Sequence, residues 1–448
     1  VESLVSQEGS ITLSYAAFDT VESRDVFPSP LMLQVYRLIN KDETRDYSLL
    51  VSELGLKKGF VPQRSVQVLN EAEWWMGEIL SGGFTRDLQD EVLKIYRNIK
   101  NGLLSWEQRL ESSFGIYDGK IRGGPKIWDS STVLSATQLE SLAACPFSYF
   151  LKYILRIEPP DEVSYDPGVW LDPAARGTLL HSIYEEFYKR ITVPGEKPSF
   201  QKHLSLLYEI ADELIYEQKI QLPPPNEVVF DYERKEILES SKIFLKSEEE
   251  LSRESTACFF ELTFGIRALT DDSLGKINPV KIELPSKKYF FLRGKIDRVD
   301  KTNDGFYCVL DYKTGSTYAY DQYKYFRGGR QLQHTLYAAA LEQILRDKGI
   351  DECPVVKEGG YSFPTLKGEG MRIMREQEDR TKFYELLEIL LELLSRGIFV
   401  MTDDADDCSY CDYPLVCDRN TYKEEIKQMI ENPLNEELEL FRRLRKYE

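Results

Sequence analysis

The sequence predicts an α/β protein in which a mixed sheet is flanked by helices. Three stretches rich in aromatic and β-branched residues, "ACFFELTFGIRAL", "KYFFLRGKIDRVD" and "FYCVLDYKTG", are typical of strands. The stretches on either side of them, such as "GTLLHSIYEEFYKRI" and "LQHTLYAAALEQILRD", carry apolar residues three to four apart, which is typical of helices. Strands with helices on both flanks indicate an α/β core.

Composition limits the kind of protein this can be. A chain of 448 residues has room for two or three domains, and 42% hydrophobic with 29% charged residues is typical of a globular protein. The formal net charge of -18 argues against a protein that coats nucleic acid nonspecifically, although it is compatible with a local basic channel. No apolar run approaches the roughly 18 residues of a membrane span, and no stretch resembles a signal peptide. We expect a cytoplasmic protein with no membrane partner, whose seven cysteines stay reduced.

The chain divides into three regions. We expect residues 1–125 to be mostly helical after a strand at 9–20, residues 130–425 to hold the α/β domain, and residues 426–448 to form a helical tail. Ser135 and Gln138 form a capping box, which predicts that a helix starts there. An ATP site is not expected, because the nearest approach to a phosphate-binding loop, "GKIRGGPK", carries Pro125 within its Gly-Lys step. Because the chain begins with Val1 rather than Met, we treat it as a possible piece of a longer protein.

Two acids and a lysine fall within one predicted hairpin, "GKIDRVDKTNDGFYCVLDYKTG". Side chains alternate along a strand, so Asp311 and Lys313 should project from one face, and pairing of the strands can bring Asp297 close to Asp311. Two close carboxylates repel each other unless a cation lies between them, and hard oxygen ligands suit Mg²⁺ or Mn²⁺. The alternative is a surface hairpin whose exposed ion pairs contribute only about 0–1 kcal/mol each.

Four motifs in a fixed order favour the metal site. They are "GTLLH", "GKIDRVD", "LDYKTG" and "LQHTLYAAAL". Over residues 134–420 this set resembles the PD-(D/E)xK (restriction-endonuclease-like) nuclease domain of the RecB type. More narrowly, it resembles the C-terminal nuclease of AddB- and RexB-type helicase–nuclease subunits, and residues 1–125 resemble the tail of the helicase-like core of such subunits.

The resemblance implies a set of metal ligands for Mg²⁺ or Mn²⁺. His181, Asp297, Asp311 and the backbone carbonyl of Tyr312 would hold the ion. Glu261 in "FFELTFG" occupies a position where related domains carry an acid, and it is a further candidate. Taken alone, a histidine on an amphipathic helix is more often a packed or surface residue than a ligand. The case for His181 therefore depends on the other motifs.

The same resemblance implies three catalytic side chains beside the metal. Lys313 would be the catalytic lysine. Gln333 and Tyr337 lie four residues apart on one helical face, so both can point at the same spot, which in the family is the active site and the entering DNA strand. His334 stands where the family usually has leucine, and we expect it to face away from Gln333.

A second site is indicated by cysteines. Cys408, Cys411 and Cys417 form a C-x2-C-x5-C array, and Cys145 lies far upstream, just ahead of the nuclease motifs. The resemblance to AddB-type subunits implies that these four hold a [4Fe–4S] cluster, which would join the start of the domain to its end. A four-cysteine zinc site fits the same ligands, and the spacing alone does not decide between them.

The function expected is a metal-dependent DNA nuclease that hydrolyses phosphodiester bonds. By resemblance, its substrate would be a single strand unwound by an AddA-like helicase during double-strand-break repair. The alternative is a non-catalytic DNA-binding module that acts with a partner that cuts. The retained Asp297, Asp311 and Lys313 argue against this alternative.

Overall fold

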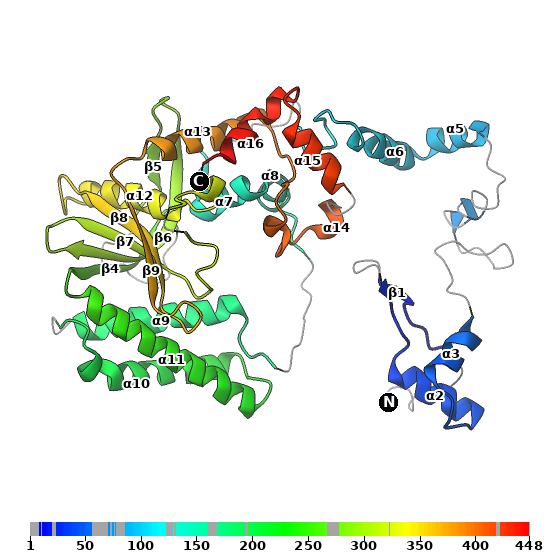
Figure 1. The fold of residues 1–448 in the computed structure, drawn as a ribbon, viewed down its shortest axis with the longest axis horizontal. Helices are drawn as coiled ribbons and strands as arrows, with labels where there is room; N and C mark the ends of the chain where they lie inside the picture. Colours follow the sequence, from blue (N-terminus) through cyan, green and yellow to red (C-terminus); the bar gives the residue numbers. More distant parts are fainter. Residues whose placement is uncertain are drawn as a thin grey trace. The chain divides into compact units, whose positions relative to one another are not determined.

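The chain forms two compact units, Val1–Trp106 and Glu107–Glu448, in a computed structural model (Figure 1). The structure describes residues 9, 11–19, 24–55, 70–71, 74–75, 77, 86–121, 129, 131–159, 168–192, 196–266, 277–321, 323–417 and 422–447.

Unit 1 is mostly helical. Its described elements are β1 (Phe18–Asp19), β2 (Arg24–Asp25), α2 (Pro30–Asn40), α3 (Tyr47–Leu54), α5 (Arg86–Ile95) and the greater part of α6 (Arg97–Arg109). The strand expected at 9–20 is wrong for most of its length, because residues 11–16 have no regular structure and only Phe18–Asp19 pairs with β2. Within the described residues of this unit, the buried hydrophobic side chains are Leu33, Leu50 and Val92, so the apolar core is small.

Unit 2 is built on a mixed seven-stranded sheet. The order β3-β6-β7-β8-β9 runs across it, and β4 and β5 pair with the long strand β6. β3 is parallel to β6, β7 is parallel to β8, and the other pairs are antiparallel. The strands are β3 (Val133–Ser135), β4 (Ser255–Phe264), β5 (Val280–Glu283), β6 (Tyr289–Thr302), β7 (Tyr307–Tyr312), β8 (Val356–Phe363) and β9 (Met371–Glu376). The three strands and the turn at "KTNDG" expected from the sequence are confirmed as β4, β6 and β7 with Thr302–Gly305.

Helices cover both faces of this sheet. Figure 1 shows α9, α10 and α11 on one side, and α7, α12 and α13 on the other. The helices of the unit are α7 (Ala136–Ala144), α8 (Pro146–Tyr149), α9 (Pro173–Thr192), α10 (Phe200–Gln221), α11 (Glu227–Leu251), α12 (Gln333–Asp347), α13 (Thr381–Arg396), α14 (Pro414–Cys417), α15 (Lys423–Glu431) and α16 (Glu439–Leu444), with a π-helical turn at Phe150–Ile154.

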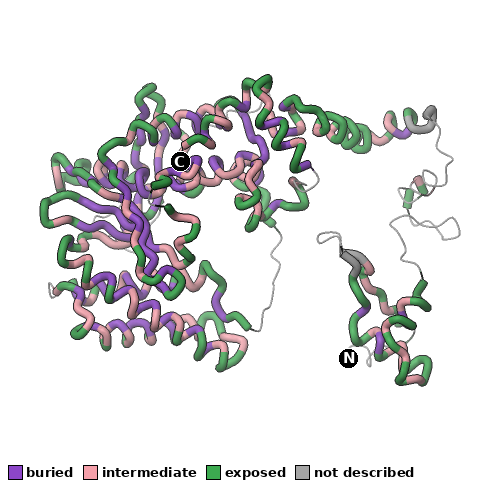
Figure 2. Tube along the Cα trace, in the orientation of Figure 1, coloured by how far each residue is buried: buried purple, intermediate pink, exposed green. Residues whose placement is uncertain are grey.

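Two apolar cores form as a result, one on each face. The first core joins β6 to α7, α12, α13 and the C-terminal helices, and the second joins α9, α10 and α11 to Tyr312. Figure 2 shows the strands as the most continuously buried part of the unit. All six residues of β7 are buried, so both of its faces are core, as expected for a central strand between two helical layers.

The start of α7 is confirmed in detail. The Ser135 hydroxyl accepts from the Gln138 amide, and the Gln138 side chain accepts from the Ser135 amide. The helix ends at Ala144 because Pro146 has no amide proton for a helical bond and disfavours a helical conformation at Cys145. The Cys145 side chain instead caps the short helix α8, so this cysteine lies at a fixed break between two helices.

Candidate active site

Strand β4 changes the face it presents to the helices at Glu261. Phe260 packs against the second core and Leu262 belongs to the first, although residues two apart on a regular strand share a face. The cause is the Glu261 backbone, whose φ of 50° lies in the left-handed region that non-glycine residues rarely adopt. Such strain is often found at functional sites. It places the Glu261 carboxylate where the two cores meet.

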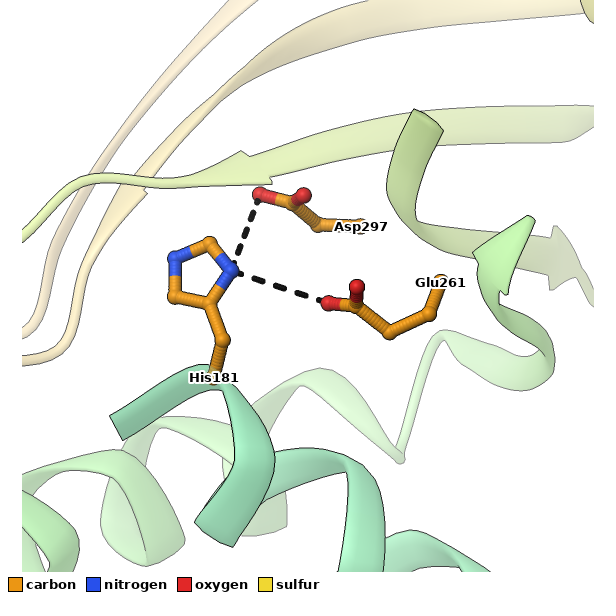
Figure 3. Close-up of side chains that lie close together, drawn as sticks. All are labelled: His181, Glu261 and Asp297. Atoms are coloured by element: carbon orange, nitrogen blue, oxygen red, sulfur yellow. Dashed lines mark ion pairs between the residues drawn. The ribbon is translucent and has the colours of Figure 1, made fainter. Parts of the chain in front are cut away.

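Three potential ligands come together at this point. Helix α9 carries His181, whose Nδ1 lies 3.6 Å from Glu261 Oε1 and 3.7 Å from Asp297 Oδ2 of β6. Figure 3 shows the imidazole facing both carboxylates. The ligand atoms of these three residues all lie within 4.8 Å of one another. Glu261, a further candidate from sequence, therefore lies inside the site.

The electrostatics of this group are those of a crowded acidic site. Burial raises the pKa of Asp297 to about 7, and the nearby charge of Asp311 adds to the effect. Burial alone would lower the pKa of His181, but the Glu261 and Asp297 carboxylates outweigh it and raise the pKa. Burial would raise the pKa of Glu261, yet His181 and Lys295 hold it below its usual value. Negative charge accumulates here and attracts a cation.

The end of β7 brings in the expected Asp-x-Lys residues. Asp311 is 7% exposed, and its Oδ2 lies 2.6 Å from Lys313 Nζ, so the two side chains share a face as predicted. Tyr312 contributes its backbone: its amide donates to Asp297 Oδ2 at 2.8 Å, and its carbonyl oxygen lies 3.2 Å from His181 Nε2. Asp311 lies outside the compact group formed by His181, Glu261 and Asp297. It adjoins that group through Asp297.

Helix α12 supplies the remaining candidates. Lys313 Nζ donates to Gln333 Oε1 at 2.8 Å, and Gln333 in turn hydrogen-bonds to Tyr337. The Tyr337 ring lies against Gly294, where an added Cβ would be 2.9 Å from Tyr337 Cε1. A glycine is therefore required in "GKIDRVD" for the ring to approach the strand. The structure brings Asp311, Lys313, Gln333 and Tyr337 into one chain of contacts.

Sequence reasoning missed Glu140 on α7. Its Oε1 accepts from the backbone amides of Leu332 and Gln333, at 2.6 and 3.0 Å, at the start of α12. Burial raises its pKa to about 7, although these hydrogen bonds and Lys313 act in the opposite direction. Glu140 thus fixes the end of the helix that presents Gln333 to Lys313. An acid within an apolar helical stretch was the signal in the sequence, and it carried no indication of its partner.

Sequence reasoning also missed the buried charges behind the site. Arg298 is 1% exposed and donates to Asp300 Oδ1 at 2.6 Å, with Glu248 as a second partner. Its Nη1 also lies 3.1 Å from the Tyr312 hydroxyl. Because Tyr312 holds Asp297 through its amide, this buried network supports the floor of the site.

The donor set fits a hard divalent cation. Carboxylate oxygens with one imidazole and a backbone carbonyl are ligands that Mg²⁺ or Mn²⁺ accepts. His181, Asp297 and the Tyr312 carbonyl lie within contact of one another, with Glu261 and Asp311 on either side. These residues are able to hold a metal ion, and the excess negative charge among them would be offset by it.

The four cysteines predicted to form a second site line one cavity of about 110 Å³. Cys145 reaches it from the break after α7, and Cys408, Cys411 and Cys417 reach it from the segment after α13. None of them is in a disulfide. Burial raises the pKa of Cys145 to about 12, which stabilises the thiol unless a cation is present. The four sulfur atoms do not approach as closely as the ligands of the first site, since within the described residues only that group lies within 4.8 Å.

Charged contacts connect this cysteine cavity to the active-site helix. Arg330, three residues before α12, donates to Asp407 at 2.7 and 2.6 Å and to Asp404 at 3.1 Å. Arg445 donates to the carbonyls of Ala143 and Ala144, just before Cys145, at 3.0 and 2.9 Å. The cysteine segment and the start of α12 are therefore held together.

No helix in the described ranges is long and apolar enough to cross a membrane.

Comparison with known proteins gives one family and one group of relatives. Residues 133–418 match the model of the PD-(D/E)XK nuclease superfamily. The relatives are named as the B-type subunit of an ATP-dependent helicase/deoxyribonuclease. The one from Clostridium perfringens (strain SM101) is 29% identical over 60% of this chain and 22% of its own length, and that from Clostridioides difficile (strain 630) is 24% identical over 89% and 34%.

The chain spans about a fifth to a third of the length of these relatives. The resemblance to AddB-type subunits inferred from the motifs is confirmed, as is the fold expected from it. Since the family model covers well over half of its residues, the chain belongs to the PD-(D/E)XK nuclease superfamily.

Proposed function

We propose that this chain is a metal-dependent deoxyribonuclease that hydrolyses phosphodiester bonds in single-stranded DNA. The observation that supports this most is the convergence of His181, Glu261 and Asp297 from three separate elements, with Lys313 adjoining them through Asp311. Non-catalytic folding does not require such a group, because burying several carboxylates together is unfavourable without a cation. Membership of the nuclease superfamily supports the same reading.

In this proposal His181, Asp297, Asp311 and the Tyr312 carbonyl hold Mg²⁺ or Mn²⁺, and Glu261 is a further ligand. A bound ion of this kind polarises a phosphoryl oxygen and lowers the pKa of water. Tyr312 orients two of these ligands, since its amide holds the Asp297 carboxylate and its carbonyl faces the His181 ring. The strained backbone at Glu261 fixes the third carboxylate.

Lys313, Gln333 and Tyr337 act on the phosphate side. The Lys313 ammonium donates to Asp311 and Gln333, so it is held in one position as a positive charge. A fixed cation stabilises the negative charge that grows on the phosphate during hydrolysis. Gln333 orients the lysine, and Tyr337 lies beside it on the same face of α12. Glu140 positions these groups by holding the first amides of that helix.

We assign a [4Fe–4S] cluster to Cys145, Cys408, Cys411 and Cys417. The support for it is their placement around one cavity and the similarity to AddB-type subunits. A cluster held by these thiolates would join residues 263 positions apart in the sequence and stabilise the domain. A zinc ion remains the alternative, and metal analysis of anaerobically purified protein separates the two.

The biological setting follows from the relatives. Their printed names make them B-type subunits of an ATP-dependent helicase/deoxyribonuclease, so we propose an AddA-like helicase as the partner of this chain in double-strand-break repair. The single strands unwound by that partner would be the substrate, and the cytoplasm the location. The second candidate function is a DNA-binding nuclease-like module whose partner cuts. It is favoured only if the metal site proves empty in solution.

The test is cleavage of end-labelled single-stranded DNA with Mg²⁺ by the anaerobically purified chain and its Asp311→Ala variant. A matched control is Asp304→Ala, which removes an acid from the exposed turn after β6. Cutting by the parent and the control but not by Asp311→Ala is expected. If none of them cuts while all bind DNA and the cysteine cluster is intact, the catalytic proposal is wrong and the binding module is favoured.

A further inference from the structure

The segment between β7 and α12 exposes two aromatic rings. Tyr318 is 95% exposed and Tyr323 is 80% exposed, although tyrosine rings usually bury most of their surface. Both lie on the stretch of chain that leads from Lys313 to Gln333. Tyr318 is five residues beyond Lys313, which places it at most about 18 Å away along an extended chain.

The backbone of this segment is anchored from below. Arg375 of β9 is 1% exposed and donates to the carbonyls of Asp321, Lys324 and Tyr325, at 3.0, 3.0 and 2.6 Å. Its Nη2 also lies 2.5 Å from Gln331 Oε1. A buried arginine whose donors hold successive carbonyls fixes the course of the segment. The exposure of the two rings is therefore set by a held backbone.

The side chain between the two rings turns inward to the active site. Tyr320 packs on Tyr361, with ring centroids 4.7 Å apart, and on Phe363 at 5.1 Å. Lys313 Nζ lies 5.5 Å from the centroid of the same Tyr361 ring. The segment thus lies against the candidate catalytic lysine through Tyr320, while Tyr318 and Tyr323 on either side of it face solvent.

We propose that Tyr318 and Tyr323 form a stacking surface for unpaired DNA bases beside the active site. This inference takes its substrate from the proposed function. Exposed aromatic rings bind single strands because every base has a flat face that is free only when the strand is unpaired. In a duplex the bases stack on each other, so the same rings would favour single strands.

The charge of the chain makes such a surface useful. With a formal net charge of -18, long-range electrostatics oppose the approach of a polyanion. Phosphate contacts also weaken as salt rises, whereas stacking on a ring is much less sensitive to salt. Two rings at the entrance would therefore hold the strand where the overall charge of the protein does not.

The test is binding of a fluorescent single strand in EDTA, so that no cleavage occurs, by the full chain and three paired variants. Tyr318→Ala with Tyr323→Ala should weaken binding by about tenfold or more. The corresponding Phe pair should bind like the parent, because the ring is kept. Tyr216→Ala with Tyr232→Ala, exposed tyrosines of α10 and α11, should also leave binding unchanged. An abasic strand of the same length should bind the parent and the Ala pair equally.

Each result decides the inference separately from the nuclease activity. Equal binding of the normal strand by the parent and the Ala pair overturns it, even if the parent cuts DNA. An equal loss for the normal and abasic strands also overturns it, because stacking needs bases. Loss of binding to the helicase partner with DNA binding unchanged would assign the rings to a protein interface instead. Tyrosine-dependent binding by a parent that does not cut would leave the stacking surface standing and refute the proposed function.

Discussion

Replacing Arg298 with methionine tests whether the buried charges behind the site hold it in place. Arg298 is 1% exposed, and its partners Glu248 and Asp300 are 2% and 0% exposed. Methionine fills much of the same space without the charge, so the main effect is to leave two buried carboxylates without their cation. Breaking a buried pair in this way costs about 3–5 kcal/mol of the free energy of unfolding.

The assay is urea denaturation followed by circular dichroism at neutral pH. We expect the transition midpoint of Arg298→Met to fall by about 1 M or more, given m-values of a few kcal/mol/M for a domain of this size. The variant should regain stability as the pH is lowered, because the two unpaired carboxylates then take up protons. Metal affinity should fall as well, since Tyr312 would lose the contact of its hydroxyl with Arg298.

A triple variant provides the control. Arg298→Met combined with Glu248→Gln and Asp300→Asn removes all three charges together, and it should recover part of the lost stability. A cost below about 1 kcal/mol for the single variant, or no recovery in the triple variant, would refute the view that unpaired buried charge is the cause.

Three further predictions concern the site itself. Lys313→Met should lower the cleavage rate by about 10²–10³-fold with DNA binding in EDTA retained; a parallel loss of binding would contradict an electrostatic role in catalysis. Gly294→Ala would place a Cβ 2.9 Å from Tyr337 Cε1, so we expect a loss of about 1–3 kcal/mol in stability and reduced activity, and an unchanged urea midpoint would show that the ring can move. Burial raises the pKa of Glu140 to about 7 from its usual 4.5, so between these pH values the folded state holds a proton that the unfolded state has released. Its contribution to stability is present below about pH 4.5 and is lost as the pH rises through about 7. The urea midpoint should therefore fall more between about pH 5 and pH 8 for the parent than for Glu140→Gln, which keeps the acceptor oxygen; equal falls would show that Glu140 does not titrate in this range.

Much of the fold could be predicted because the signals were local. The alternation of β4, β6 and β7, the turn between the last two and the capping box of α7 depend on neighbouring residues. The strand expected at 9–20 shows the limit of this reasoning. Its residues alternate in the right way, but only a two-residue partner strand is described for them, and isolated extended segments are not stable.

The site was predictable where the motifs carried it. The proximity of Asp297 and Asp311 followed from hairpin pairing, and the shared face of Asp311 and Lys313 followed from strand alternation. The role of Glu140 could not be predicted in this way, because its partners lie 192 and 193 residues away. Nor could the change of face at Glu261, since a left-handed backbone at a non-glycine residue has no local signature.

The link between Arg330 and the aspartates of the cysteine segment bears on how the protein is made. The helix that presents Gln333 is held at its start by partners that are translated 74 and 77 residues later. The end of α7 is held by Arg445, translated about 300 residues after it. A ribosome that stops before Asp404 would release a chain with every candidate catalytic residue but without these supports. Because domains fold as units once enough of the chain has emerged, DNA would be protected from cutting by unfinished copies of its own nuclease.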